Sequence, residues 1–103
     1  MTTLPKNRPP THPGEMLLKE FLEPLGITQM ELAERIHVSY PRVNELIHGK
    51  RRMTPDTALR LAKLLRTTPE FWLNGQRNWD LWHAMHAPDA REIERIRSVK
   101  GAA

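Results

Sequence analysis

The stretch from Thr28 to Ile47 carries the start signals of two short helices with almost no chain between them. Thr28 and Glu31 have the spacing of a capping box, in which each side chain accepts a hydrogen bond from the other residue's backbone N–H. Ser39 is a favoured N-cap residue, and Pro41 suits the first turn of the helix that follows. The two predicted helices are separated only by His37, Val38 and Ser39. Two helices joined by so short a turn must cross and pack against each other.

Three small or branched apolar residues lie where such a crossing needs them. Two helices that cross at a steep angle require a small residue where their axes approach and an apolar residue opposite it. Ala33 in the first helix and Val43, ten residues later, match these requirements, and Val38 lies at the turn. The pattern predicts a helix-turn-helix with these three residues as its internal packing. A helical hairpin without a nucleic-acid role is the alternative that the spacing leaves open.

Similar signals divide the rest of the chain into further helices. A first helix is expected over residues 13–25, a fourth from Thr54 and a fifth from Thr68 to about Pro88, each with a proline in its first turn. The chain shows no alternating strand pattern, and its predicted connections are short, which favours an all-α, five-helix fold. The predicted parts are a flexible basic arm (1–11), the helix-turn-helix domain (12–87) and a tail or short weak helix (88–103).

Composition excludes several classes of function. The chain has 103 residues and no cysteine, which excludes disulfides, thiolate zinc sites and cysteine catalysis. None of its five histidines lies in an HExxH pattern, and it has neither a Gly-x-Ser-x-Gly elbow nor a glycine-rich phosphate loop. We therefore expect no metal, no cofactor and no enzymatic activity. No apolar run approaches the ~18 residues that span a bilayer. The net charge of +4 suits a polyanionic partner.

The second helix of a helix-turn-helix is the one that enters the major groove of DNA. Its apolar residues form an inward stripe, so its other side chains face outward. Among these, Arg42 suits a guanine edge, Asn44 suits adenine, and Glu45 can accept a hydrogen bond from cytosine. The predicted base-reading residues are Ser39, Tyr40, Pro41, Arg42, Asn44 and Glu45.

A run of three cations follows this helix. Phosphate contacts supply most of the affinity for DNA and no direct sequence information, and Lys50, Arg51 and Arg52 are well placed to make them. Gln29 and Thr54 begin the neighbouring helices, whose free backbone N–H groups suit the same phosphates. We therefore predict phosphate contacts at all five residues. A solvated basic turn is the alternative for the cations.

Three tryptophans recur along the last predicted helix. Trp72, Trp79, Trp82 and Met85 share one face, because they are spaced by seven, three and three residues. The simplest interpretation is that they close the core. This apolar face is wider than a peripheral helix needs, which indicates that part of it forms a subunit interface. A homodimer would also double the contact with DNA.

With these motifs, the sequence resembles the HigA-type antitoxins of the Xre, or lambda-repressor-like, helix-turn-helix superfamily. The resemblance spans about residues 8–87 and rests on the helix-turn-helix and on three further segments: HPGEMLLKEFLEPLGIT, HGKRRMTPDTALRLAKLL and TPEFWLNGQRNWDLW. It implies a homodimer that binds operator DNA, represses its own operon and neutralises a co-encoded RelE-like toxin, an mRNA-cleaving ribonuclease. It also implies a cytoplasmic bacterial protein, and it assigns base reading and phosphate contact to the residues named above.

Three positions depart from the family pattern. His37 replaces the usual turn glycine, and histidine tolerates the left-handed conformation better than most residues. Tyr40 and Pro41 replace a polar pair at the reading end of the helix, so the operator sequence does not follow from the resemblance. Gly75 replaces an apolar residue, which is expected to loosen the last helix.

Two other functions are compatible with the same sequence. The first is a stand-alone Xre-type transcriptional regulator with no toxin partner. The second is a protein-interaction module whose tryptophan face binds a partner while the helix-turn-helix is vestigial. An adjacent reading frame for a basic RelE-like protein argues against the first, and binding to the upstream DNA argues against the second.

Overall fold

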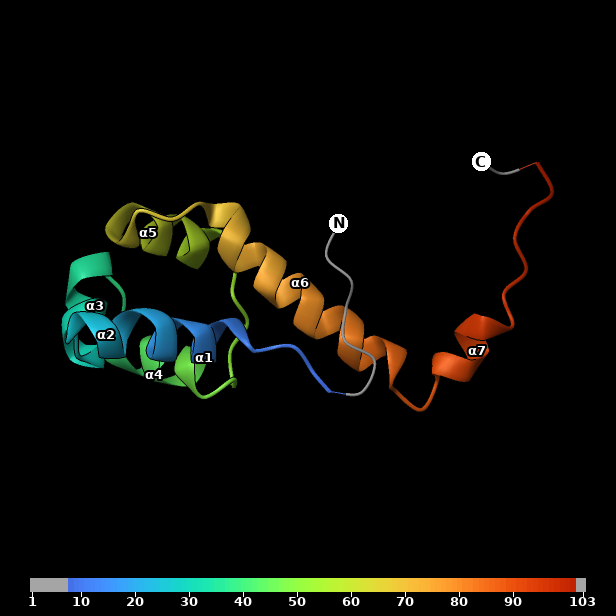
Figure 1. The fold of residues 1–103 in the computed structure, drawn as a ribbon, viewed down its shortest axis with the longest axis horizontal. Helices are drawn as coiled ribbons and strands as arrows, with labels where there is room; N and C mark the ends of the chain where they lie inside the picture. Colours follow the sequence, from blue (N-terminus) through green and yellow to red (C-terminus); the bar gives the residue numbers. More distant parts are fainter. Residues whose placement is uncertain (1–7, 102–103) are drawn as a thin grey trace.

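Helices make up the regular structure of residues 8–101, the part of the chain that this computed structural model describes. The described residues contain no strand, and the predicted all-α fold is confirmed. The elements, shown in Figure 1, are α1 (Pro13–Leu17), η1 (Leu18–Leu22), α2 (Glu23–Leu25), α3 (Gln29–Ile36), α4 (Tyr40–Ile47), α5 (Pro55–Leu65), α6 (Pro69–Met85) and α7 (Ala90–Glu94).

The first three elements follow one another without a break and form the helix predicted over residues 13–25. Its middle, η1, is a π-helical turn, which the sequence analysis did not predict, and the Glu23 N–H closes it by donating to the Leu18 carbonyl. Pro24 has no N–H to donate to a carbonyl four residues earlier, so a regular α-helix cannot continue through this point. Gly26 ends the helix in the left-handed conformation, with φ 67°.

The helix-turn-helix consists of α3, α4 and the turn between them. Both hydrogen bonds of the capping box are present at the start of α3: the Glu31 N–H donates to Thr28 Oγ1 at 3.1 Å, and the Thr28 N–H donates to Glu31 Oε1 at 3.3 Å. Ser39 caps α4, where its Oγ accepts from the Arg42 N–H at 3.3 Å. His37 turns the chain with φ 59°, in the left-handed conformation that glycine adopts at the least cost.

The two helices pack through small and branched side chains. Ala33 and Val43 are buried, and Val38 lies half-buried at the turn, where its N–H donates to the Ala33 carbonyl at 3.0 Å. The start of α1 closes the other side of α4. Gly14 lies so close to Leu46 that a Cβ atom at Gly14 would collide with the Leu46 carbonyl oxygen. Close backbone approach therefore fixes the position of α4 in the domain.

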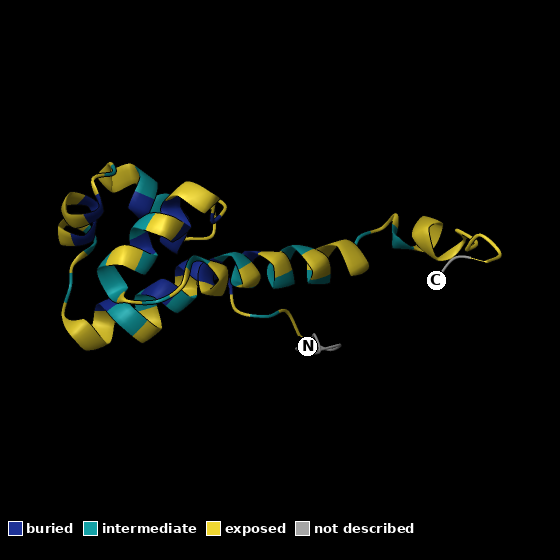
Figure 2. Cartoon of the chain, turned by 90° about the horizontal axis from the view of Figure 1, so that it is seen from above, coloured by how far each residue is buried: buried dark blue, intermediate teal, exposed yellow. Residues whose placement is uncertain are grey.

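α6 begins in the core and ends outside it. Trp72, near its start, is fully buried, with its ring centre 5.2 Å from that of Phe21, and its Nε1–H donates to Thr67 Oγ1 at 2.7 Å. Beyond Gln76 the helix contributes no buried residue. Figure 2 shows the C-terminal half of α6 and α7 extending away from the buried part of the domain. The molecule is accordingly elongated, with extents of 53 × 26 × 22 Å.

The predicted arm and tail are described only in part. Residues 1–7 of the predicted arm lie outside the described residues, and positions 8–11 are mostly exposed. In the predicted tail, α7 is a single short helix, and residues 91–101 are exposed throughout.

Candidate nucleic-acid interface

One face of α4 is buried and the opposite face is exposed. Val43, Leu46 and Ile47 lie in the core, as their spacing predicts. Tyr40 and Pro41 form the exposed first turn. The other predicted base-reading residues are exposed or half-buried: Ser39, Arg42, Asn44 and Glu45. The N-terminal end of the recognition helix is therefore accessible from outside the protein.

Asn44 is oriented by a residue of the preceding helix. Its Nδ2 donates to Oε1 of Gln29, the first residue of α3, at 3.0 Å. An amide nitrogen carries two hydrogens, so one side-chain N–H and the side-chain oxygen Oδ1 of Asn44 have no hydrogen-bond partner among the described residues. These two groups form the donor–acceptor pair that recognises the edge of adenine. A predicted base-reading residue and a predicted phosphate contact are thus in direct contact with each other.

Arg42 is hydrogen-bonded to the first turn of α5. Its Nη2 donates to Asp56 Oδ2 and to Thr57 Oγ1, both at 2.7 Å. Arg60 donates to the same Asp56 oxygen at 2.9 Å. Hydrogen bonds from Arg42 and then Arg60 hold the pKa of Asp56 below its usual value, so the carboxylate stays ionised near neutral pH. The positive charge of Arg42 therefore lies against a negative one.

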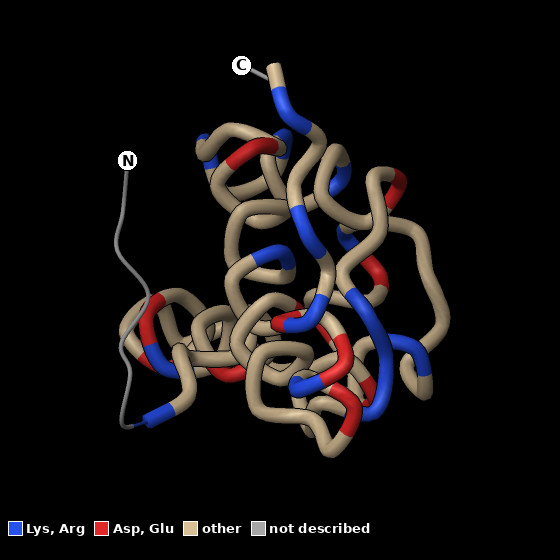
Figure 3. Tube along the Cα trace, turned by 90° about the vertical axis from the view of Figure 1, so that its right-hand side faces the viewer, with Lys and Arg blue, Asp and Glu red and all other residues tan. Residues whose placement is uncertain are grey.

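Two of the three predicted phosphate-binding cations are also paired with carboxylates. Arg51 donates to Glu45 Oε1 through Nη2 at 2.8 Å and through Nε at 3.1 Å. Arg52 forms an ion pair with Asp80 of α6 at 2.7 Å. Lys50 makes no ion pair within residues 8–101. Figure 3 shows basic and acidic positions interspersed over the molecule rather than separated onto two faces.

The starts of α3 and α5 flank α4. The Asn44–Gln29 bond joins α4 to the first turn of α3, and the Arg42–Asp56 bond joins it to the first turn of α5. Thr54 caps α5, where its Oγ1 accepts from the N–H three residues later. First-turn N–H groups at helix N-termini attract anions. The structure therefore brings two helix N-termini to the sides of the recognition helix.

Four residues of this region were not found by the sequence analysis. The pairing of Asp56 with Arg60 could have been predicted from their spacing, because residues four apart on one helix share a face. Thr57 and Asp80 approach their partners only through tertiary packing, from 15 and 28 positions along the chain. No local pattern indicates those contacts.

The predicted subunit interface is wrong for one of its four residues. Trp72 has 0% exposed surface and belongs to the core, where no partner can reach it. Trp79 and Trp82 are half-buried on the projecting part of α6, and Met85 near its end is exposed. The Trp79 ring lies edge-on to His12, with ring centres 5.0 Å apart. Three of the four predicted residues therefore remain on accessible surface.

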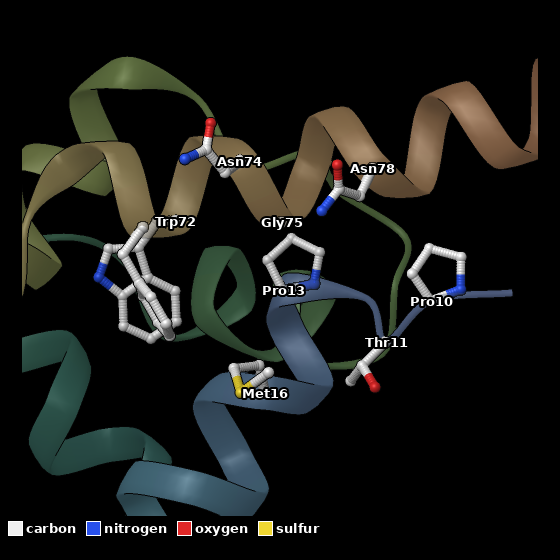
Figure 4. Close-up of a pocket in the computed structure, with 9 residues that line it drawn as sticks. Pro10, Thr11, Pro13, Met16, Trp72, Asn74, Gly75 and Asn78 are labelled. Carbon is white, nitrogen blue, oxygen red and sulfur yellow. The ribbon is translucent and has the colours of Figure 1, made fainter. Parts of the chain in front are cut away.

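A pocket of about 370 Å³ lies between the start of α1 and α6 (Figure 4). Its walls include Pro10, Pro13 and Met16 on one side and Asn74, Gly75 and Asn78 on the other. A Cβ atom at Gly75 would lie 3.5 Å from the Cβ atom of Pro13, which is ordinary contact distance. An alanine would therefore fit at position 75, and a larger apolar side chain would enter the pocket.

Between residues 8 and 101 no three His, Asp or Glu side chains come together as a potential metal site. The His83 side chain instead contacts its own helix, since its Nδ1 lies 2.8 Å from the Trp79 carbonyl, one turn earlier in α6. No helix in the described part of the chain combines the length and apolar character needed to cross a membrane.

Comparison with known proteins places this geometry in a family. The helix-turn-helix family model matches residues 18–73. The chain is 45% identical over 93 residues to the HTH-type transcriptional regulator YbaQ of Escherichia coli K12, covering 89% of this chain and 82% of YbaQ. It is 51% identical over 75 residues to antitoxin HigA-1 of Vibrio cholerae, covering 73% and 70% of the two chains.

A solved structure agrees with these relatives. The antitoxin GraA in complex with its operator superimposes with a TM-score of 0.82 and 36% sequence identity, covering 94% of this chain and 98% of GraA. These relatives are transcriptional regulators and antitoxins rather than enzymes. The chain belongs to the HigA-type antitoxin family of Xre, or lambda-repressor-like, helix-turn-helix proteins.

Proposed function

We propose that this protein is a homodimeric antitoxin that binds operator DNA sequence-specifically, represses its own operon and neutralises a co-encoded RelE-like toxin. The observation that carries the DNA-binding part is the accessible edge of α4, on which Asn44 is oriented by Gln29. An amide held in one orientation before binding loses less conformational freedom when it contacts a base. The GraA structure, with an antitoxin on its operator, supports the same use of the fold.

The base contacts are assigned to the outward edge of α4. Asn44 suits adenine, and the exposed Tyr40 and Pro41 offer apolar contact to a thymine methyl group. Ser39 lies at the end of the helix that would come nearest to the bases. The Glu45 carboxylate can accept from cytosine once Arg51 moves to a phosphate.

The phosphate contacts are assigned to the positions around this edge. Lys50 is the most available cation, since it has no carboxylate partner among residues 8–101. Arg51 and Arg52 are exposed and can exchange their carboxylates for phosphates. Gln29 and Thr54 mark the helix N-termini whose free N–H groups face the same strands.

The dimer is assigned to the projecting part of α6. Trp79, Trp82 and Met85 leave apolar surface outside the core, and tryptophan is a frequent anchor of interfaces. A two-fold pair would present two recognition helices to two half-sites of an operator.

The toxin partner is supported by the relatives rather than by a surface of this chain. HigA-1 and GraA are antitoxins, whereas YbaQ is described as a transcriptional regulator, which keeps the stand-alone regulator as a second candidate. Co-expression with the neighbouring reading frame tests the difference. The antitoxin proposal predicts that a second, basic chain co-purifies at a fixed ratio and that its toxicity is suppressed. Purification of this chain alone, with no rescue of growth, would support the stand-alone regulator.

DNA binding is tested separately on the purified full chain. Fluorescence anisotropy with the DNA upstream of its gene, compared with a shuffled duplex of equal length, gives the specificity ratio. A specific operator complex binds typically ~10³-fold or more tightly than non-specific DNA. Equal affinity for both duplexes at moderate salt would contradict the repressor proposal.

A further inference from the structure

Arg42 is the one predicted base-reading residue whose side chain is bound to another helix at two points. Its Nη2 donates to Asp56 Oδ2 and to Thr57 Oγ1, each at 2.7 Å. Thr57 is buried, and its hydroxyl is also contacted by Thr54 Oγ1 at 3.3 Å. The guanidinium is therefore held by the start of α5.

The geometry of a guanidinium limits what Arg42 can do in this position. A guanine edge is read by two parallel N–H groups of arginine, one to O6 and one to N7. A guanidinium can form such a pair in two ways: Nε–H together with one Nη2–H, or Nη1–H together with the other Nη2–H. Either pair therefore needs a free Nη2 hydrogen. Both Nη2 hydrogens of Arg42 are occupied, one by Asp56 and one by Thr57. No two-pronged contact to guanine is left while these bonds persist.

The carboxylate that holds Arg42 is itself fixed. Arg60 Nε donates to the same Asp56 oxygen at 2.9 Å. Arg60 Nη1 donates to the carbonyls of Ile36 and His37, at 2.8 Å and 3.2 Å, where α3 ends and the turn begins. A continuous chain of polar contacts therefore links the end of α3, the start of α5 and the first turn of α4. These are the three segments whose relative positions decide how α4 meets a duplex.

We propose that Arg42 is a positioning residue that fixes the recognition helix against α5 through Asp56 and Thr57, and does not read a base. This inference rests on the proposed operator binding. Base reading then falls to the side chains of α4 that have no such anchor on α5, chiefly Tyr40, Pro41 and Asn44. Loss of the anchor changes how well α4 fits any operator, and it leaves the order of base preferences intact.

The test measures affinity for the operator and for each of its single-base-pair variants, using wild type, Arg42→Ala, Asp56→Ala and the double variant. Lys63→Ala is the control for loss of one exposed charge, about two turns further along α5. We expect Arg42→Ala and Asp56→Ala each to weaken operator binding by about tenfold, because a charge-assisted hydrogen bond is lost. The double variant binds no more weakly than either single variant, and all three keep the wild-type order of base preferences.

A base-reading Arg42 gives the opposite pattern. Arg42→Ala would then erase the preference at one base pair per half-site, and Asp56→Ala would keep or strengthen it. That outcome, or an unchanged affinity for Arg42→Ala, overturns the inference. Wild-type protein that does not distinguish operator from shuffled DNA contradicts the proposed function itself, and the two failures are therefore distinguishable.

Substitutions at Thr57 separate positioning from general loss of the fold. Thr57→Ser keeps the hydroxyl that accepts from Arg42, whereas Thr57→Val keeps the size and removes the acceptor. We expect wild-type operator affinity for Thr57→Ser and a uniform, several-fold loss for Thr57→Val at temperatures where melting curves show both variants folded. Equal operator affinities for the two folded variants would contradict the inference.

Discussion

The side-chain nitrogen of Asn44 donates to the side-chain oxygen of Gln29 at 3.0 Å, which joins the recognition helix to the start of α3. The bond is part-buried and links residues 15 positions apart. It leaves a donor and an acceptor of Asn44 directed by a neighbour rather than free to rotate. The orientation of this amide is therefore a property of the folded domain that precedes contact with DNA.

Removing the Asn44 amide is expected to weaken binding selectively. Asn44→Ala costs about 1–3 kcal/mol at one base position per half-site and leaves other positions unchanged, because a two-pronged adenine contact is lost. Gln29→Ala costs less at the same position, since Asn44 keeps its amide and loses only its orientation. Titrations with single-base-pair operator variants measure both effects. A loss spread evenly over all variants would contradict a base contact by Asn44.

Lys50, which has no ion-pair partner among residues 8–101, is expected to dominate the salt dependence of DNA binding. Each phosphate contact contributes about 0.9 to the slope of log affinity against log salt, so Lys50→Ala lowers the slope by roughly 2 in a dimer. Replacing Lys50, Arg51 and Arg52 together lowers it by less than the roughly 5 expected for three free cations per subunit. The reason is that Glu45 and Asp80 take up cations when Arg51 and Arg52 move from them to phosphates on DNA binding. This uptake offsets part of the counterion release that sets the slope. An unchanged slope for Lys50→Ala, measured beside Lys63→Ala, would contradict this assignment.

The proposed dimer is tested at the exposed end of α6. Met85 and Met30 are both 59% exposed, but only Met85 lies on the projecting helix. We expect Met85→Glu to shift the solution mass from two chains to one, because a charge is costly to bury in an interface. Met30→Glu is the matched control and keeps the mass of two chains. Light scattering that gives one chain for wild type, or two for Met85→Glu, would argue against this interface.

The buried His12 is expected to make stability depend on pH. Its Nδ1 accepts from the Gly14 N–H at 2.9 Å and caps α1, which requires an unprotonated Nδ1. Burial lowers the pKa of His12; nearby Asp80 and Glu15 oppose this shift, and His83 adds to it. The unfolded state, with a pKa of about 6.5, therefore gains a proton before the folded state does. This contribution to stability is complete above that pH and is lost as the pH falls towards the lower pKa of the folded state.

Melting temperatures at about pH 7.5 and about pH 5 measure this effect. Asn is also a good N-cap but does not titrate, so His12→Asn should lose less stability between the two values than wild type. Each kcal/mol of difference corresponds to ~4–8 °C in a domain of this size. The other histidines are exposed and are unchanged by the substitution, so their contribution cancels in the comparison. Equal losses for the two proteins would show that His12 does not carry the dependence.

Helix starts and the buried stripe of α4 could be predicted because their causes are local. Thr28, Ser39 and Thr68 each cap the helix predicted to follow them, through bonds to an N–H three residues later. The π-helical turn was missed, because its sequence reads as a continuous amphipathic helix up to Pro24.

The contacts that decide the side-chain roles could not be predicted in the same way. Arg42 meets Asp56 across 14 positions, and Arg52 meets Asp80 across 28, so only the packing of α5 and α6 brings them together. Trp72 shares a helix face with Trp79, but the core ends between them. The Trp72 ring is therefore buried, whereas the Trp79 ring is partly accessible. Periodicity shows which residues share a face and not where the core ends.

Photo-crosslinking from the first turn of α4 shows whether this edge of the protein meets the bases of the operator. Tyr40 and Phe71 are aromatic residues of similar exposure, 44% and 42%, on α4 and α6. Each is replaced in turn by p-azidophenylalanine, and the full chain is irradiated on its upstream DNA. We predict a crosslink to operator bases from position 40 and none from position 71. A crosslink from position 71 alone, or none from position 40 in a complex that forms, would show that the first turn of α4 does not face the bases.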